Sequence, residues 1–339
     1  MLVGPPGLGA VGVGHHLSVS TAAAKLCVVT GASGYIGREL IPHLLDAGYR
    51  VRALARTPAK LDSASWRARI DVARGDLTDK ASLVQAFADA DVVYYLVHSM
   101  GSSRDFVAAE KRSADNVVDA ARRAGVRRIV YLSGLHPDGP LSPHLASRRA
   151  VGDILIESGI ETVVLQAGIV IGAGSASFEM IRHLTDRLPV MTTPKWVRNR
   201  IQPIAITDVL HYLTHAASAP VPASRTWDIG GPDIMEYGQA MQIYADVAGL
   251  RRRTIIALPV LTPSLASWWV GLVTPIPLGL ARPLVESLEF DAVAREHDIN
   301  DSIPPPTSGL IGYRDAVVRA LGGDRSGGHR LAQWISTSS

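Results

Sequence analysis

The stretch that decides the fold runs from Leu26 to Gly37 and reads LCVVTGASGYIG. A short apolar run enters a turn with three glycines, and a helical apolar pattern follows. Gly31 permits a sharp turn, Gly34 lets the backbone approach a pyrophosphate, and Gly37 permits close helix packing. The helix start offers amide groups and a positive dipole end to phosphates. An ordinary tight turn is the alternative, but the order strand, glycine turn, helix favours a dinucleotide site, whose predicted contacts are Gly31, Ser33, Gly34, Tyr35, Ile36 and Gly37.

Strand-like and helix-like segments alternate through the first half of the chain. The expected strands are 26–30, 50–55, 69–73, 91–97, 128–132 and 161–165, and the expected helices are 36–47, 81–88, 104–124 and 142–158. Repeated alternation indicates parallel pairing with right-handed crossovers. The sequence therefore predicts an α/β fold with a Rossmann-type doubly wound parallel sheet.

The regular alternation weakens after Gly168, where prolines mark turns between short elements. This change predicts a small C-terminal α+β substrate lobe packed on the strand ends. The expected organisation is a disordered leader at 1–24, a dinucleotide-binding Rossmann core at 25–170, the small lobe at 171–322 and a loose tail at 323–339. The leader carries no Lys or Arg before Lys25, which argues against a secretory signal.

The composition is that of a folded globular protein, with 47% hydrophobic and 19% charged residues. The net charge of +3, from 34 basic and 31 acidic residues, is too small to indicate a nucleic-acid partner. Cys27 is the single cysteine, so no internal disulfide can form, and its apolar surroundings predict a buried thiol. Together these features predict a cytoplasmic protein.

Residues 254–281 contain no charged side chain, and they are long enough to span a bilayer. Four prolines argue against a transmembrane helix, because each removes a backbone donor: Pro259, Pro263, Pro275 and Pro277. A buried or interfacial segment with peripheral membrane contact is the preferred interpretation. Trp268 and Trp269 suit the wall of an apolar pocket, although core packing or a partner surface would use the same residues.

The end of the second strand bears on the choice between NAD and NADP. An acidic residue there would accept from a ribose 2′-hydroxyl, but this position carries Arg56, whose guanidinium suits a 2′-phosphate. A solvated loop arginine is the alternative. After the third strand, Asp76 either lies beside the adenine or caps the following helix, and Leu77 is its neighbour in the predicted site.

Several segments resemble the extended and atypical branches of the short-chain dehydrogenase/reductase superfamily, including bacterial NAD(P)H-binding (NmrA-like) proteins. They are the turn at 30–37, Gly75-Asp76-Leu77, and the segments 94–101, 200–209 and 228–232. The resemblance implies a Rossmann fold, bound NADP(H) or NAD(H), and oxidoreductase chemistry. It also implies a cofactor neighbour at Gly168, after the sixth strand. His98 follows the fourth strand, at the edge where ligands bind in open α/β sheets, so it is a predicted cofactor or substrate neighbour, with a loop role without chemistry as the alternative.

The usual catalytic set of this superfamily is a serine followed by Tyr-x-x-x-Lys on the next helix. Ser133 matches the serine, but the helix places His144 and Arg148 at the other two positions. Arg148 can hold a ribose but cannot act as a lysine-like proton relay, because it is always charged. His144 can act as acid or base, and the neighbouring cation is expected to lower its pKa. An ordinary helix face is the alternative for both residues.

The preferred interpretation is an NADPH-dependent oxidoreductase acting on an apolar carbonyl or hydroxyl compound. The alternative is a non-catalytic NADP(H)-binding sensor or accessory subunit, which the altered Tyr-x-x-x-Lys motif favours. A metal site is not expected, because His211 and His215 have helical spacing but no third ligand accompanies them. Asp208 is expected to cap the helix that carries them.

Overall fold

A computed structural model describes residues 1, 24–97, 106–137, 139–258, 282 and 284–324. Its centre is a seven-stranded parallel sheet in the order β3-β2-β1-β4-β5-β6-β11, which confirms the predicted Rossmann-type fold. The order reverses between β1 and β4, the point at which such sheets bind ligands. The strands are β1 (Leu26–Thr30), β2 (Arg50–Ala55), β3 (Asp71–Arg74), β4 (Val92–Tyr95), β5 (Arg128–Gly134), β6 (Glu161–Ala167) and β11 (Arg225–Ile229).

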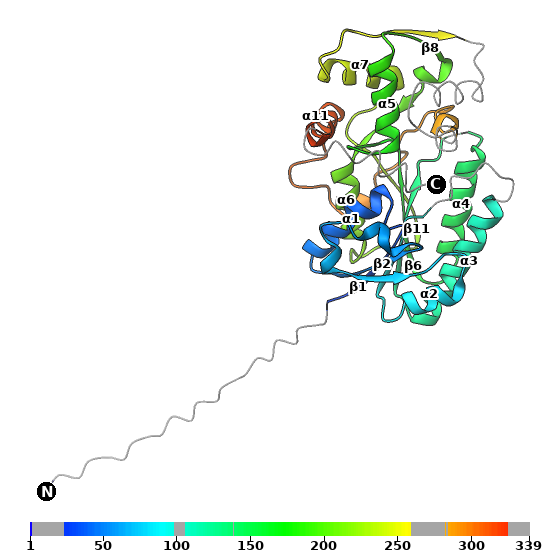
Figure 1. Ribbon diagram of the computed structural model, residues 1–339, viewed down its shortest axis with the longest axis vertical. Coiled ribbons are helices and arrows are strands. Elements are labelled where there is room, and N and C mark those ends of the chain that lie inside the picture. The colour runs from blue at the N-terminus through cyan, green and yellow to red at the C-terminus, as the bar shows by residue number, and fades with distance from the viewer. Residues whose placement is uncertain (2–23, 98–105, 138, 259–281, 283, 325–339) are drawn as a thin grey trace.

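Helices cover both faces of this sheet (Figure 1). On one face α1 (Tyr35–Asp46) packs against α6 (Ile206–Ala216), and on the other lie α2 (Lys80–Ala86), α3 (Phe106–Ala124) and α4 (Pro143–Ile156). Strands covered on both faces become nearly continuous apolar runs, and all five residues of β1 are buried. This double burial explains why the strands could be recognised from sequence.

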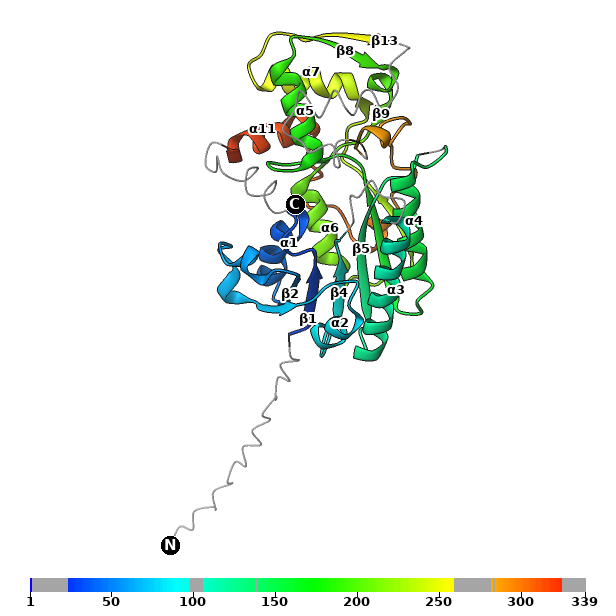
Figure 2. The same cartoon turned by 45° about the vertical axis from the view of Figure 1, so that its right-hand side comes forward.

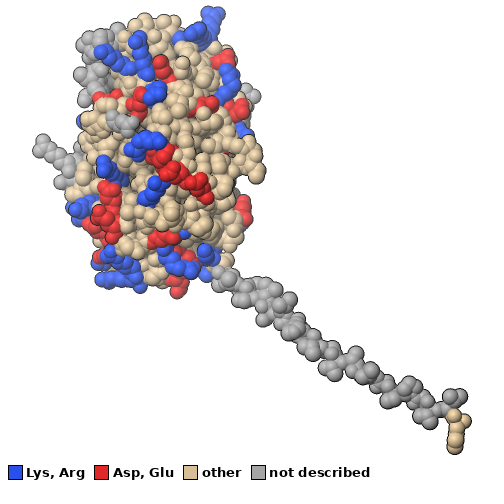
Figure 3. All heavy atoms as spheres, turned by 180° about the vertical axis from the view of Figure 1, so that it is seen from behind, with Lys and Arg blue, Asp and Glu red and all other residues tan. Residues whose placement is uncertain are grey.

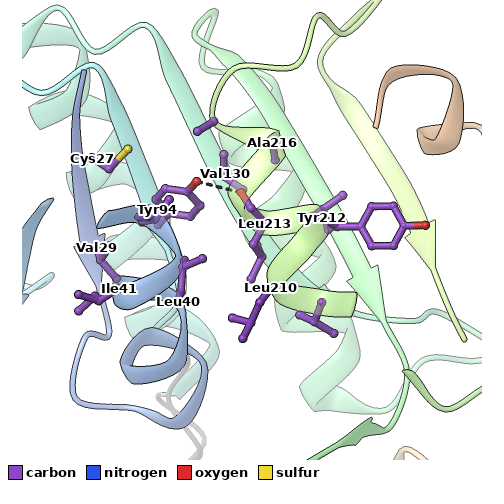
Figure 4. Close-up of a cluster of buried hydrophobic side chains, with 14 of the residues drawn as sticks. Cys27, Val29, Leu40, Ile41, Tyr94, Val130, Leu210, Tyr212, Leu213 and Ala216 are labelled. Atoms are coloured by element: carbon purple, nitrogen blue, oxygen red, sulfur yellow. Dashed lines mark hydrogen bonds between the residues drawn. The ribbon is translucent and has the colours of Figure 1, made fainter. Parts of the chain in front are cut away.

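A buried hydrogen bond joins the sheet to α6 (Figure 4). Tyr94 on β4 is fully buried, and its hydroxyl donates to the Leu213 carbonyl at 2.9 Å. Cys27 on β1 is also fully buried, as predicted. Desolvation raises the pKa of the Cys27 thiol to about 12, so it behaves as an apolar core residue.

A smaller lobe lies beyond the carboxyl ends of the sheet strands (Figure 2). Its own buried cluster joins α5, α7 and α11, with three short strand pairs around it. Its helices are α5 (Ala176–Arg187), α7 (Tyr237–Val247) and α11 (Tyr313–Asp324), and its strands are β7 (Val170–Ile171), β8 (Val190–Pro194), β9 (Arg200–Ile201), β10 (Ile204–Ala205), β12 (Met235–Glu236) and β13 (Thr254–Leu258). The remaining short helices are η1 (Pro58–Leu61), η2 (Arg67–Arg69), η3 (Lys195–Arg198) and α10 (Ile299–Ser302).

The structure differs from the predicted boundary at residue 170. Strand β11 pairs with β6, with Arg225 opposite Val163, and α6 packs on α1, so both belong to the core although both fall within 171–322. The chain therefore enters the lobe and returns, a path that local sequence patterns do not reveal. Residues 2–23 of the predicted leader, residues 325–339 of the predicted tail and residues 259–281 of the uncharged segment lie outside the described residues.

The described residues include no helix that is both long enough and apolar enough to span a membrane.

Candidate dinucleotide and substrate site

The three glycines of the phosphate turn have three different steric roles. Gly31 has φ +70°, and a Cβ there would lie 2.8 Å from the Leu96 carbonyl oxygen. A Cβ on Gly37 would lie 2.4 Å from the Gly31 carbonyl oxygen, so this glycine lets the first turn of α1 close against the loop. A Cβ on Gly34 would meet only the Gly31 oxygen, at 3.2 Å. The fold itself therefore depends on Gly31 and Gly37 far more than on Gly34.

The start of α1 provides the chemistry of an anion site. Gly34 is the N-cap residue and supplies no side-chain acceptor, while its own amide donates to the Gly31 carbonyl at 2.9 Å. The first-turn amides, including those of Ile36 and Gly37, are thus uncapped by any side chain. A diphosphate fits such a cradle, because it supplies the missing acceptors at the positive end of the helix.

Two side chains tie this turn to neighbouring segments. The Thr30 hydroxyl donates to the Tyr94 carbonyl at 2.9 Å and accepts from the Leu96 amide at 3.2 Å, which holds the end of β4 beside the turn. The Tyr35 hydroxyl occupies the space where a Cβ on Gly172 would lie. The turn therefore contacts the entrance to the small lobe through Tyr35.

Arg56 lies directly after β2, where the 2′-phosphate was predicted. It is exposed, and no hydrogen bond or ion pair joins it to another described residue. Nearby, Arg38 donates from Nε to the Ser33 carbonyl at 3.1 Å and from a terminal nitrogen to the Lys60 carbonyl at 2.6 Å. Arg38 was missed in the sequence analysis, although its position directly after Gly37 was a usable signal. It links the phosphate turn to the loop that carries Arg56.

One alternative for Asp76 is excluded. The N-cap of α2 is Asp79, whose carboxylate accepts from the amides of Ala81 and Ser82. Asp76 instead accepts from the amide and hydroxyl of Thr78, at 2.9 and 2.8 Å. The capping role is therefore wrong for Asp76, and contact with the adenine stays a prediction.

The remaining predicted cofactor neighbours are placed as follows. Leu77 is buried, and its carbonyl accepts from the Asn116 side chain at 2.9 Å. A Cβ on Gly168 would lie 3.0 Å from the Gln202 carbonyl oxygen, so the backbone packs closely at this glycine. His98 lies outside the described residues. Cofactor contacts by these three residues stay predictions.

Ser133 and Arg148 meet at the carboxyl end of β5. Both are buried, and Arg148 donates to the Leu132 carbonyl at 2.5 Å while its guanidinium lies 5.8 Å from the Tyr131 ring centroid. Burial raises the pKa of Tyr131, and Arg148 and the nearby Ser133 hydroxyl oppose that rise. Within the described residues, however, the Ser133 hydroxyl and the Arg148 Nε make no well-aligned hydrogen bond. Buried polar groups in this state normally have a partner, so these two atoms are candidates for ligand contacts.

His144 lies one helical turn before Arg148. Burial, followed by the Arg148 cation, lowers the pKa of the imidazole to about 4, in the direction expected from the sequence. At neutral pH His144 is therefore uncharged and can donate one hydrogen bond and accept another.

A second histidine at this end of the sheet was missed. His136 follows β5, and its Nδ1 lies 2.8 Å from the Gln166 side-chain nitrogen. Burial and then the Arg295 cation lower the pKa of His136 to about 4. Arg295 in turn binds the buried Asp228 carboxylate, with Nε to Oδ2 at 3.1 Å. The position of His136, three residues after Ser133, was the signal available in the sequence.

These two histidines predict an acid-sensitive stability. Between about pH 6.5 and pH 4 the unfolded chain binds protons that the folded protein excludes from His136 and His144, so the free energy of unfolding falls as pH falls. Replacing both by Gln should reduce the loss between pH 7 and pH 4.5 by at least about 1 kcal/mol. Urea denaturation at several pH values measures this, with His43→Gln, an exposed position, as the control. An unchanged pH slope in the double variant would contradict the prediction.

The predictions for α6 have mixed outcomes. The N-cap of this helix is Ala205, and Asp208 lies in the first turn, where it accepts from the Ile311 amide at 2.8 Å, so the predicted cap is wrong. Asp208 is needed instead to join α6 to a distant segment. His211 bonds the Pro304 carbonyl and His215 the His211 carbonyl. The described residues contain no cluster of three or more His, Cys, Asp or Glu suited to a metal ion.

The switch-point turn, the uncapped helix start and the polar groups beside them define a Rossmann-type dinucleotide-binding protein. Residues 31–177 match the family model described as NAD(P)H-binding. The resemblance to atypical short-chain dehydrogenases/reductases is thereby confirmed for the fold and for the cofactor-binding domain.

The whole chain is similar to proteins with different activities. It is 26% identical to ceramide reductase of Caulobacter vibrioides over 314 residues, which cover 90% of this chain and 98% of that one. It is 24% identical over 336 residues to the mitochondrial NADH dehydrogenase [ubiquinone] 1 alpha subcomplex subunit 9 of Mus musculus, covering 96% of this chain and 85% of that one. Among solved structures, the NADPH complex of an NADPH-dependent quinone oxidoreductase from Escherichia coli has a TM-score of 0.68 at 19% identity, covering 87% and 99% of the two chains.

Proposed function

We propose that this protein is an NADPH-dependent reductase that converts an apolar carbonyl compound to an alcohol. The observation that carries the proposal is the pair of buried polar atoms at the carboxyl end of β5, the Ser133 hydroxyl and the Arg148 Nε, which make no well-aligned hydrogen bond to described residues. They lie at the strand ends where ligands bind in open α/β sheets. Ceramide reductase and the quinone oxidoreductase, similar to this chain, support an apolar substrate.

Each group at the site has a separate role in this proposal. The uncapped amides of α1 hold the diphosphate, and Arg56 pairs with the 2′-phosphate. Ser133 donates to the substrate carbonyl oxygen, and Arg148 donates to the nicotinamide ribose. When bound, NADPH supplies a hydride to the carbonyl carbon. The oxygen then needs one proton, which water supplies. The neutral His144 can relay it, because one ring nitrogen accepts a proton from water while the other passes its own proton to the oxygen, and hydroxide is left behind.

The test is consumption of NADPH with a panel of aldehydes, quinones and long-chain ketones. Ser133→Ala is expected to lower kcat/KM at least about tenfold through loss of the hydrogen bond to the developing oxyanion, while NADPH affinity stays unchanged. Ser63→Ala is the matched control, because Ser63 is exposed and lies between β2 and β3, distant in sequence from Ser133. Equal activity of the Ser133 and Ser63 variants would exclude the role given to Ser133.

The second candidate is a protein that binds NADPH without turnover, as a sensor or an accessory subunit. The specific observation in its favour is that Arg148 already uses one nitrogen to hold the Leu132 carbonyl at the end of β5. The similarity to a subunit of NADH dehydrogenase points the same way. Tight NADPH binding with no turnover of any panel member would favour this candidate.

A further inference from the structure

The strand pair β8–β13 forms the end of the small lobe that is farthest from the N-terminal end of the sheet (Figures 1 and 2). In the parallel register Val190 lies opposite Thr254, and Thr192 opposite Ile256. Side chains alternate along a strand, so these four share the outer face. Val190 is 57% exposed and Ile256 is 45% exposed. The outer face of the pair is therefore uncharged and partly apolar.

Basic residues flank the two strands in sequence, and Figure 3 shows several Lys and Arg side chains at the top of the molecule, the end that β8 and β13 form. Four exposed basic residues flank the two strands in sequence: Lys195, Arg198, Arg251 and Arg252. The sequence has no Asp or Glu between Asp186 and Asp208 or between Asp246 and Glu286.

The two acidic residues closest in sequence are already paired. Asp186 accepts from the Tyr244 hydroxyl at 2.9 Å and lies 3.8 Å from Arg182, and Asp246 forms an ion pair with Arg314 at 2.5 Å. Lys195, Arg198, Arg251 and Arg252 therefore give this end of the lobe a positive field.

The Gln242 side chain binds the backbone at the end of the basic run that precedes β13. The Gln242 side chain donates to the Arg253 carbonyl at 2.6 Å and accepts from the Arg253 amide at 3.1 Å. The next amide, of Thr254, donates to the Pro189 carbonyl at 3.0 Å. Arg253 is buried, whereas Arg251 and Arg252, which precede it, are exposed.

We propose that the β8–β13 end docks on an anionic lipid surface. The flanking cations pair with lipid phosphate and carboxylate groups, and Val190 and Ile256 enter the boundary between headgroups and acyl chains. An uncharged face within a cationic frame matches a membrane surface, whereas a nucleic acid would leave the apolar face without a partner. The surface is independent of the proposed reductase activity, and it includes none of residues 259–281.

The test is co-sedimentation of the full-length protein with vesicles of phosphatidylcholine containing phosphatidylserine, compared with phosphatidylcholine alone. Each basic residue near an anionic surface contributes about 1 kcal/mol, so Arg251→Gln with Arg252→Gln should lower the partition coefficient about thirtyfold. Lys111→Gln with Arg112→Gln removes the same charge from two exposed positions on α3 and is the matched control. Ile256→Ser should lower binding further without changing its salt dependence.

Binding that requires phosphatidylserine, is lost in the Arg251/Arg252 variant and persists in the Lys111/Arg112 variant supports the proposal. No binding to anionic vesicles, or equal losses in both double variants, overturns it. Sedimentation velocity tests whether this face joins two copies of the chain. A dimer that Ile256→Glu dissociates, together with no binding to vesicles, overturns the proposal. Stabilisation by NADPH, measured for every variant by thermal unfolding, shows that the cofactor domain is intact, so the vesicle result stands apart from any failure of the reductase proposal.

Discussion

Replacing Gly34 by Ala is expected to weaken dinucleotide binding at least about tenfold while the protein stays folded. The new Cβ would meet only the Gly31 carbonyl oxygen, at 3.2 Å, and the backbone at Gly34 has φ −76°, which alanine adopts without strain. The same Cβ would occupy the space in which a pyrophosphate approaches the turn. Titration of NADPH by fluorescence measures the affinity, and urea denaturation should show a loss of no more than about 1 kcal/mol.

Gly37→Ala is the matched comparison, because we expect it to lower the stability of the fold, whereas Gly34→Ala lowers the affinity for the dinucleotide. Its Cβ would lie 2.4 Å from the Gly31 carbonyl oxygen and 2.9 Å from the Ala32 Cα, so backbone atoms must move. We expect a loss of about 3 kcal/mol in the free energy of unfolding. Undiminished NADPH affinity in Gly34→Ala would show that the diphosphate does not lie on this turn.

Arg56→Ala is expected to weaken NADPH binding by between about tenfold and a hundredfold and to leave NADH binding unchanged. A guanidinium that pairs with a phosphate in a charge-assisted contact contributes roughly 1.5–3 kcal/mol, and NADH lacks that phosphate. Arg56 is exposed and joined to no other described residue, so its removal should not alter the fold. Isothermal titration with both dinucleotides measures the two affinities.

The control for this selectivity is Arg123→Ala, which removes an exposed arginine from α3. It should change neither affinity. Equal losses for NADPH and NADH in Arg56→Ala would remove the 2′-phosphate assignment and leave the preference for NADPH without a structural basis.

The elements that sequence patterns located within a few residues are those whose signals are local. Strands β1 and β2 have the predicted bounds, because both are apolar runs followed by a turn. Gly125 ends α3 with φ +70°, as a glycine after a helix is expected to do. The glycine turn likewise carries its whole chemistry within seven residues.

The features that escaped prediction depend on contacts between distant parts of the chain. Arg38 acts through the Lys60 carbonyl, and His136 is placed by Gln166, 30 residues later. Strand β11 joins β6 only after the chain has passed through the small lobe. Asp208 looked like a cap because it opens a helix, but its partner is the Ile311 amide. Sequence periodicity contains no information on such pairs, since it reports which face of an element is buried and not what covers it.

The return of β11 and α6 to the central sheet means that the small lobe is not an exchangeable unit. A graft that replaced everything after residue 170 would also remove one edge of the sheet and the helix that covers α1. New specificity in this scaffold is therefore easier to reach by substitutions within the lobe than by recombination, because the chain that leaves the lobe completes the central sheet.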